Sequence, residues 1–511
     1  MGGNPEEGSD RSGPGLGRGS LRGAQGIVPK AGSPLLARHA LGALVTLSGT
    51  VFLSLALGLA GWGVFATAIF LFVAMEGILA NNGIAAFIIQ NPKSQPVQEA
   101  TGNTLQCLVG LSMFCVSLGL AAAFVIAGKA GARPLVILFP LVGCGAFLTS
   151  FSTVPMALMA KKLRFRSVAR IELSGVVVLY GLAVVLAAAG AGVELLGIAF
   201  VAKGGVSAVL AFLFARPRKL FALKRSSLRE IYRTGGPIAL SNVGAWFTEA
   251  GMPLIAGALL GTAALGIYRI AYTVLNYPRV LAYIFGRVLF SALSAEDRPD
   301  VRRKLAWRTF LGLSVMLSPA ILTIGALASI WAPGIFRKPE WSALPSVFLV
   351  AGFHWTLYTL VYIPIQTLIV ARRTQSVIAY FAVYSAVFLV GTVLLSPVLD
   401  ILSMPVAGTL AAVAGVPLLL HRFRQTYRGG SFWVLVQQLL VLVPLCGVVW
   451  YLGGAGKAAV AVLIWFAAVG LHLALHRRAR YYAWSFLQGF ASRPEDRGAP
   501  AGLDAGNKDR N

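Results

Sequence analysis

The chain has 511 residues, of which 57% are hydrophobic and only 12% are charged, and its mean hydropathy is +0.76. Soluble proteins are usually about a quarter charged, so these values exclude an ordinary soluble domain and place most of the chain in lipid. The net charge of +26 is typical of a membrane protein with basic cytoplasmic loops, which we favour over a nucleic-acid-binding protein.

About fourteen membrane-spanning helices are predicted, because about 20 mostly apolar residues are enough to cross a bilayer. Residues 1–36, rich in Gly, Arg, Ser and Pro, are expected to form a disordered cytoplasmic arm, and residues 476–511 a basic cytoplasmic tail. The predicted spans lie near residues 37–60, 63–90, 102–127, 134–158, 171–190, 195–215, 235–260, 263–292, 305–330, 343–370, 377–398, 401–421, 432–452 and 457–475.

The charges in the loops give this multi-pass protein an orientation. If the N-terminus is cytoplasmic, the loops near 161–170, 216–233 and 298–308 are all inside, and each holds a cluster of Lys and Arg. Cytoplasmic loops carry such an excess of basic residues, so both termini are predicted to be cytoplasmic. The outside loops hold few basic residues: Lys129, Arg133, Arg337, Lys338 and Lys457.

A short repeat indicates two lobes. Gly63-Val64-Phe65 opens the second predicted helix and Gly266-Ile267-Tyr268 opens the eighth, and in each an Ala follows three residues later. Because six helices separate the copies, they have the same orientation, as in transporters whose pathway lies between two lobes. We therefore predict an N-lobe over residues 37–215, a basic linker over 216–234, a C-lobe over 235–421 and two further helices over 432–475.

The predicted helix 263–292 carries polar residues along one face. At about 100° per residue they fall within roughly an 80° arc, which lipid does not tolerate, so the face is expected to line protein or water. Arg287, near the cytoplasmic edge, is interpreted as an anchor, and Pro278 predicts a kink. The residues of this face are Arg269, Tyr272, Asn276, Arg279, Tyr283 and Arg287.

Three more candidates lie in neighbouring helices. Trp246 and Glu249 share a face of helix 235–260, and Glu76 lies at a similar depth in the second helix, where it is expected to face the arginines across a cleft. Ionisable groups inside a membrane are functional by default. The alternatives are structural: a buried ion pair between Glu249 and Arg269, or a stripe that only bonds to neighbouring helices.

The chemistry of these residues suits an anionic ligand. Arg269 and Arg279 are expected to contact phosphate, because guanidinium pairs with it in bidentate fashion. Tyr272, Asn276 and Trp246 would complete the substrate site, and Glu76 and Glu249 would bind a coupling proton or cation. No enzyme motif, phosphate-binding glycine loop or metal-ligand spacing is present in the sequence, so we expect no enzyme activity, no cofactor and no metal.

The segments "NNGIAAFIIQ", "KKLRFRSVAR", "GGPIALSNV", "LGTAALGIYRIAYTVLNYP" and "GRVLFSALS" make the sequence similar to the polysaccharide transporters, the lipid-linked oligosaccharide flippases of the multidrug/oligosaccharidyl-lipid/polysaccharide (MOP) exporter superfamily. The family often has Pro where this chain has Ser291-Ala292. The resemblance implies a two-lobed, all-α transporter of the bacterial inner membrane with a central cationic cavity. It would move undecaprenyl-diphosphate-linked sugar units outward by alternating access, for exopolysaccharide, capsule or O-antigen (lipopolysaccharide) synthesis.

The partners implied are the anionic lipid-linked oligosaccharide, membrane lipids and, beside them, a polysaccharide polymerase and glycosyltransferases, with no nucleic acid. Two other functions stay open at this point. A cation-coupled multidrug antiporter of the same superfamily is disfavoured by the arginines, since it would have an acidic cavity. A scaffold of an envelope polysaccharide complex would use the polar face as a seam between packed helices.

Overall fold

The computed structural model describes residues 19–427, except residues 82, 92–94, 128–132, 163, 218, 280–281, 283–285, 287–288, 290–292, 294–297 and 372. The predicted helices over 432–475, the tail and the start of the arm lie outside this part. Within it the chain is helical, with no strand. The helices are α1 (Gly19–Asn81), α2 (Ile84–Gln90), α3 (Pro96–Ile126), α4 (Arg133–Lys161), α5 (Phe165–Ala188), α6 (Ile198–Ala215), α7 (Arg225–Trp246), α8 (Met252–Leu260), α9 (Thr262–Asn276), α11 (Pro299–Ile335), α12 (Leu344–Thr359), α13 (Tyr362–Val370), α14 (Thr374–Leu399) and α15 (Ser403–Thr426).

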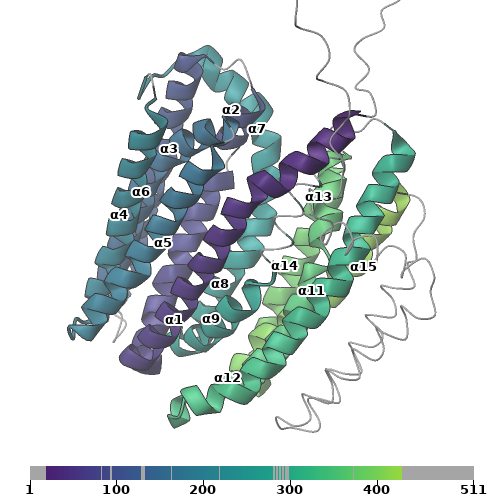
Figure 1. The fold of residues 1–511 in the computed structure, drawn as a ribbon. Helices are drawn as coiled ribbons and strands as arrows, with labels where there is room; N and C mark the ends of the chain where they lie inside the picture. Colours follow the sequence, from purple (N-terminus) through teal and green to yellow (C-terminus); the bar gives the residue numbers. More distant parts are fainter. Residues whose placement is uncertain are drawn as a thin grey trace, which may run out of the picture.

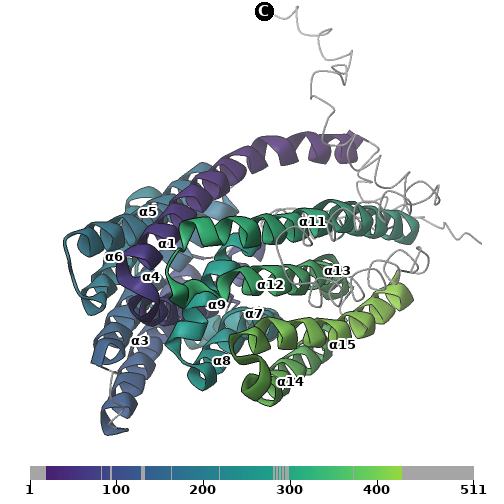
Figure 2. The same ribbon diagram turned by 90° about the horizontal axis from the view of Figure 1, so that it is seen from below.

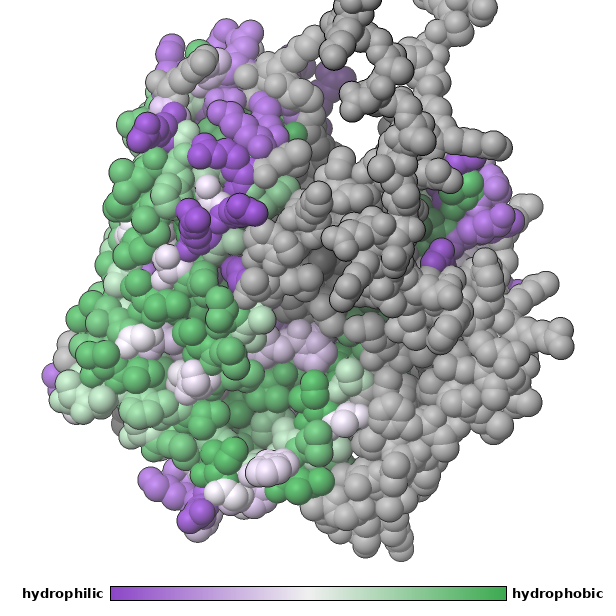
Figure 3. All heavy atoms as spheres, in the orientation of Figure 1, coloured by the Kyte–Doolittle hydropathy of each residue, from purple (hydrophilic) through white to green (hydrophobic). Residues whose placement is uncertain are grey.

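The chain is a multi-pass membrane protein. In the described part, seven helical stretches are long and apolar enough to cross a membrane. Two of them, Arg38–Ala80 with 43 residues and Thr374–Thr426 with 53, are more than twice as long as the roughly 30 Å hydrocarbon core at about 1.5 Å per residue. Figure 3 shows the corresponding surface, a broad hydrophobic belt with hydrophilic residues towards both ends. The total of about fourteen crossings is not confirmed by these stretches.

The long helices are interrupted at defined residues. Gly58 has a φ of 65° and divides α1 into two helices, close to the predicted break at residues 60–63, because only glycine adopts this conformation without strain. α9 ends at Asn276 and a turn follows at Tyr277 and Pro278, which confirms the predicted kink. α1 begins at Gly19, so residues 19–36, expected to be disordered, extend the first helix.

The described helices pack in two groups (Figure 1). α3 packs on α4, α4 on α6, and α5 on both α1 and α6; in the other group, α14 packs on α15, and α12 packs on α11 and α15. The most extensive contact between the groups joins α1 to α9, and Figure 2 shows α9 between α1 and α12. The division into an N-lobe over residues 37–215 and a C-lobe over residues 235–421 stays a prediction.

The two copies of the short repeat touch each other where α1 meets α9. The indole nitrogen of Trp62 donates a hydrogen bond to the Gly266 carbonyl over 2.8 Å. A side chain on Gly63 would overlap the Thr262 carbonyl, and a Cβ on Gly266 would lie 2.9 Å from the Gly63 Cα. Both glycines therefore permit backbone contact between the groups.

α7 belongs to both groups. It begins at Arg225, inside the predicted linker 216–234, because its first turns bury Ile231 against α2, α3 and α4 of the first group. Glu230 accepts a 2.7 Å hydrogen bond from Gln98 of α3. Towards its other end, a Cβ on Gly244 would lie 2.9 Å from Phe381 of α14 in the second group. One helix thus crosses the boundary between the groups.

Candidate functional site

Glu249 lies in a π-helical segment, η2 (Phe247–Gly251), which the sequence pattern did not predict. The segment lies between α7 and α8, so residues 235–260 are helical as predicted but do not form a single α-helix. Pro253 explains the interruption, because it cannot donate the hydrogen bond that the Glu249 carbonyl would accept in an α-helix. Single π turns inside helices occur frequently at functional sites.

Arg279 is the centre of the site. Its side chain is 3% exposed, and its Nη2 atom lies 2.7 Å from a carboxylate oxygen of Glu249. Its Nη1 atom donates to Asn276 over 2.8 Å. The guanidinium also lies over two rings of α12, 4.4 Å from the centre of Trp355 and 4.9 Å from that of Tyr358. A buried guanidinium is stable only with such partners.

Arg269 is buried differently. It is 6% exposed and its guanidinium lies 4.7 Å from the centre of the Phe70 ring and 5.2 Å from that of Tyr272. Its Nε and Nη1 atoms have no hydrogen-bond partner among the described residues. Contact with aromatic rings stabilises a desolvated cation by about 2 kcal/mol, but it does not satisfy the N–H donors. The alternative ion pair between Arg269 and Glu249 is wrong, since Glu249 pairs with Arg279.

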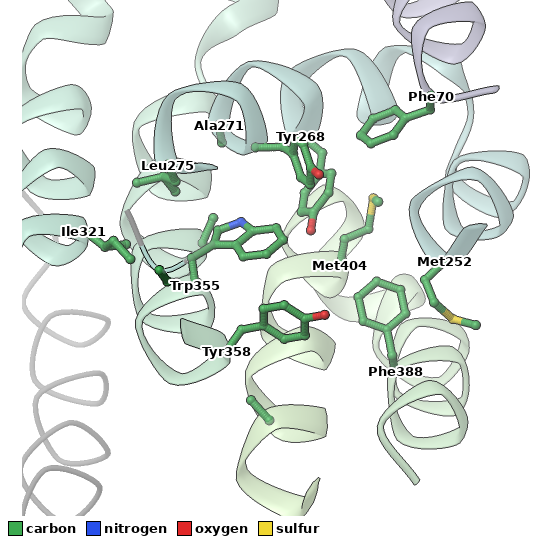
Figure 4. Close-up of a cluster of buried hydrophobic side chains, with 14 of the residues drawn as sticks. Phe70, Met252, Tyr268, Ala271, Leu275, Ile321, Trp355, Tyr358, Phe388 and Met404 are labelled. Carbon is green, nitrogen blue, oxygen red and sulfur yellow. The ribbon is translucent and has the colours of Figure 1, made fainter. Parts of the chain in front are cut away.

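The two arginines are joined by aromatic side chains. Tyr272, 7% exposed, packs edge-on against Phe70 at 5.5 Å and against Trp355 at 5.2 Å between ring centres. The order Phe70, Arg269, Tyr272, Trp355, Arg279 forms what we name the arginine–aromatic row. In Figure 4, Trp355 projects from its helix into the cluster that contains Phe70. The row runs from α1 of the first group, through α9, to α12 of the second.

Trp246 and Glu76 lie beside this row. The Trp246 indole donates to the Val73 carbonyl over 3.4 Å and packs where a side chain on Gly77 would overlap it. Glu76 forms a 2.7 Å ion pair with Lys203 of α6. Its partner is therefore a base of the same group of helices, and a position facing the arginines across a cleft stays a prediction.

Several site residues were missed in the sequence. Trp355 and Tyr358 stack on Arg279, and His354 forms a hydrogen bond with the Tyr384 hydroxyl. The signal was present in "FHWTLY", residues 353–358, a polar aromatic cluster in the middle of an apolar helix. Among the described residues, three buried polar atoms near Arg279 have no hydrogen-bond partner: His354 Nδ1, Trp355 Nε1 and Tyr380 Oη.

The functional groups gathered here are guanidinium, carboxylate, indole, phenol and amide. Guanidinium binds phosphate and carboxylate, and indole and phenol rings present an apolar face with a polar edge. In the described part of the chain, no three His, Cys, Asp or Glu residues are placed to hold a metal ion. Tyr283 and Arg287 of the predicted polar face lie outside the described side chains.

Comparison with solved structures shows the fold. "Lipid II flippase MurJ, inward closed conformation" superposes with a TM-score of 0.64 at 11% identity, over 90% of this chain and 99% of that one. The inward-facing conformation of a multidrug resistance MATE family transporter of the MOP superfamily gives 0.60 at 16% identity, over 76% and 96%. MATE in complex with MaL6 gives 0.56 at 15%, over 80% and 98%.

Sequence comparison gives the family. No curated protein sequence matches the chain. The pattern that defines the polysaccharide biosynthesis protein family matches residues 55–337, a range that includes α9, Glu249 and both arginines. Because the match covers more than half of the chain, this protein belongs to the polysaccharide biosynthesis protein family.

Proposed function

We propose that the protein is a flippase that moves undecaprenyl-diphosphate-linked oligosaccharide or polysaccharide units from the cytoplasmic to the outer face of the bacterial inner membrane. Its family and its transporter fold support this function. Synthesis of exopolysaccharide, capsule or O-antigen would supply the substrate through glycosyltransferases, and a polymerase would use it after transfer.

The observation that carries the proposal is the state of Arg269. Its buried guanidinium offers two N–H donors with no acceptor among the described residues, and an uncompensated charge inside a membrane protein is costly. An anion that reaches Arg269 during transport would satisfy these donors. A diphosphate suits this position, because phosphate oxygens accept paired hydrogen bonds from one guanidinium.

Arg279 would take part by exchanging partners. Its donors are already engaged by Glu249 and Asn276, so a phosphate group reaches Arg279 only by displacing the Glu249 carboxylate. The displaced carboxylate would then need a proton or another cation to compensate its charge. This exchange would link the binding of a proton or cation at Glu249 to the binding of phosphate at Arg279. Glu76, which is paired with Lys203, is the second candidate for ion coupling.

Alternating access would require the two groups to act as lobes. Residues 37–215 and 235–421 are the proposed lobes, with both termini cytoplasmic and about fourteen crossings in all. Arg269 and Tyr272 are buried where α1 meets α9, so separation of the lobes at this contact would uncover the arginine–aromatic row. Tyr272, Asn276 and Trp246 would then face the sugar or the lipid headgroup.

The test is transport by variants reconstituted in lipid vesicles. Arg269→Ala should abolish the appearance of lipid-linked oligosaccharide on the far leaflet, measured by accessibility to a membrane-impermeant lectin. Arg337→Ala removes an exposed arginine of a predicted outside loop and should transport normally. Folded protein is quantified for both variants by gel filtration. Full transport by Arg269→Ala would refute the assigned site.

A scaffold function has one observation in its favour, since Tyr272 is packed between Phe70 and Trp355. Cysteines placed at positions 272 and 276 in a cysteine-free chain distinguish the two functions. A flippase cycles, so both positions should react with a water-soluble maleimide, and substrate should change the rate. Complete protection under all conditions would support a permanent helix-packing seam.

A further inference from the structure

The segment 219–224, which leads into α7, is fixed along α3 by hydrogen bonds. Asn103 donates to the Leu220 carbonyl over 2.9 Å, and Thr104 donates to the Ala222 carbonyl over the same distance. The Ala222 amide donates back to Thr104 over 3.2 Å. These bonds satisfy backbone groups that a non-helical segment leaves open, so the segment has a defined place on the helix surface.

This segment presents large apolar and basic side chains outward. Leu220, Phe221 and Leu223 are 47%, 54% and 67% exposed. Lys219 and Lys224 are exposed beside them. Apolar side chains of this size, flanked by bases on one strip, are typical of segments that lie at a membrane interface.

The position along α3 sets the depth of the strip. Near its start, Gln98 bonds to Glu230 and Glu99 lies 3.8 Å from Lys161, which marks the polar end of the helix. Its first exposed large apolar residues are Leu108 and Leu111. Asn103, which holds the segment, lies between these two regions, so the strip lies at the level of α3 where polar contacts give way to exposed apolar side chains.

The basic charge of the strip favours an anionic lipid headgroup. From 216 to 233 the sequence "RPRKLFALKRSSLREIYR" has seven basic residues and one acidic residue, Glu230, which is engaged by Gln98. We propose that segment 219–224 and the start of α7 form a docking strip for anionic phospholipid, with Leu220, Phe221 and Leu223 in the outer hydrocarbon and Lys219, Lys224 and Arg225 on the phosphates. This surface is independent of the transport site.

Lipid binding to the purified full chain in a neutral detergent tests the strip. Native mass spectrometry should show phosphatidylglycerol bound in preference to phosphatidylcholine. In the triple variant Lys219→Gln/Lys224→Gln/Arg225→Gln the half-saturating phosphatidylglycerol concentration should rise on the order of a hundredfold, because each base near an anionic surface contributes about fivefold. The control Arg303→Gln/Lys304→Gln/Arg422→Gln removes three charges elsewhere and should leave this concentration unchanged. Equal effects of both variants would overturn the proposal.

The depth of the strip in the membrane provides the second test. A bimane fluorophore on Leu223→Cys, in a cysteine-free chain in nanodiscs, should be quenched by lipids brominated near the headgroup end of the acyl chain and only weakly by aqueous iodide. The same label on Lys304→Cys, at the exposed start of α11, should show the opposite pattern. Strong iodide quenching at position 223, with no lipid quenching, would show that the strip faces water or a soluble partner.

Discussion

Arg279 and Glu249 are paired over 2.7 Å although they come from different helical segments and lie 30 residues apart in the chain. The pair joins the π segment to the residues after the Pro278 turn, and it holds Arg279 against Trp355. A carboxylate in this position satisfies the same donors that a phosphate would take, which makes Glu249 an internal stand-in for the proposed substrate.

Glu249→Gln should therefore bind substrate more tightly and transport it more slowly. The amide keeps the size of the side chain but removes the charge that competes for Arg279, so the dissociation constant of a short-chain prenyl diphosphate should fall by about tenfold. Release of the substrate should slow, because the neutral amide cannot displace the phosphate from Arg279 as the Glu249 carboxylate would. Calorimetry and vesicle transport measure the two effects. Glu99→Gln is the matched control, since its carboxylate is also close to a base, Lys161, at the polar end of α3; unchanged affinity in Glu249→Gln would argue against exchange.

Trp355 should matter through its ring face. It is 3% exposed, packs edge-to-face with Tyr272 and lies beneath the Arg279 guanidinium. Trp355→Ala leaves a cavity that costs about 3–5 kcal/mol in a packed core and should lower both the Tm in detergent and transport. Trp355→Phe keeps an aromatic face and should retain most of the transport per folded molecule. If both variants lost transport equally, the indole nitrogen and not the stacking would be required.

Gly63→Ala should disturb the contact between α1 and α9. The added methyl overlaps the Thr262 carbonyl, so the contact between the two groups opens and the Tm falls. Labelling of a cysteine at position 272 should become faster in this variant. Gly42→Ala, in the part of α1 before Gly58 with no atom near the new methyl, should be neutral or slightly stabilising, since alanine favours helix. Equal labelling rates in the two variants would contradict the proposal that the lobes separate at the contact between α1 and α9.

Lys203→Met should destabilise the first group by isolating Glu76. Removing one member of a buried ion pair typically costs about 3–5 kcal/mol, and less is expected here because the Glu76 side chain is 29% exposed. The double variant Lys203→Met/Glu76→Gln should recover most of the loss in Tm, since it leaves no unpaired charge. A double variant no more stable than the single one would mean that Lys203 acts mainly through its contact with Phe72.

Much of the arrangement is readable from the sequence because lipid imposes simple demands. Long apolar stretches, Pro278 and the repeat around Gly63 and Gly266 predicted helices, a turn and a pair of related segments, and the structure contains each of them. The π segment was not predictable from hydropathy, since Phe247–Gly251 keeps the apolar pattern of a helix. Its only sign was Pro253, which removes one backbone hydrogen-bond donor from the helix.

The ion-pair partners of the charged residues were harder to predict from the sequence than the burial of those residues. The spacing of Arg269, Tyr272 and Arg279 predicted correctly that they avoid lipid. Which acid meets which base depends on how helices far apart in sequence pack, and the chain contains no spacing that encodes the pairs Glu249–Arg279 and Glu76–Lys203. The site residues of α12 were visible as an aromatic cluster but had no link to the arginines until the fold placed them together.

The course of α7 has a consequence for dividing this protein into two pieces. By sequence, the basic segment 216–224 looks like the place to cut, yet Ile231 and Glu230 beyond it complete the surface of the first half. A fragment that ends before Arg225 would expose an apolar patch formed by Ile84, Phe87 and Leu105. Co-expressed halves should assemble best when each keeps its own copy of residues 225–235, so the structural border between the halves is an overlap and not a point.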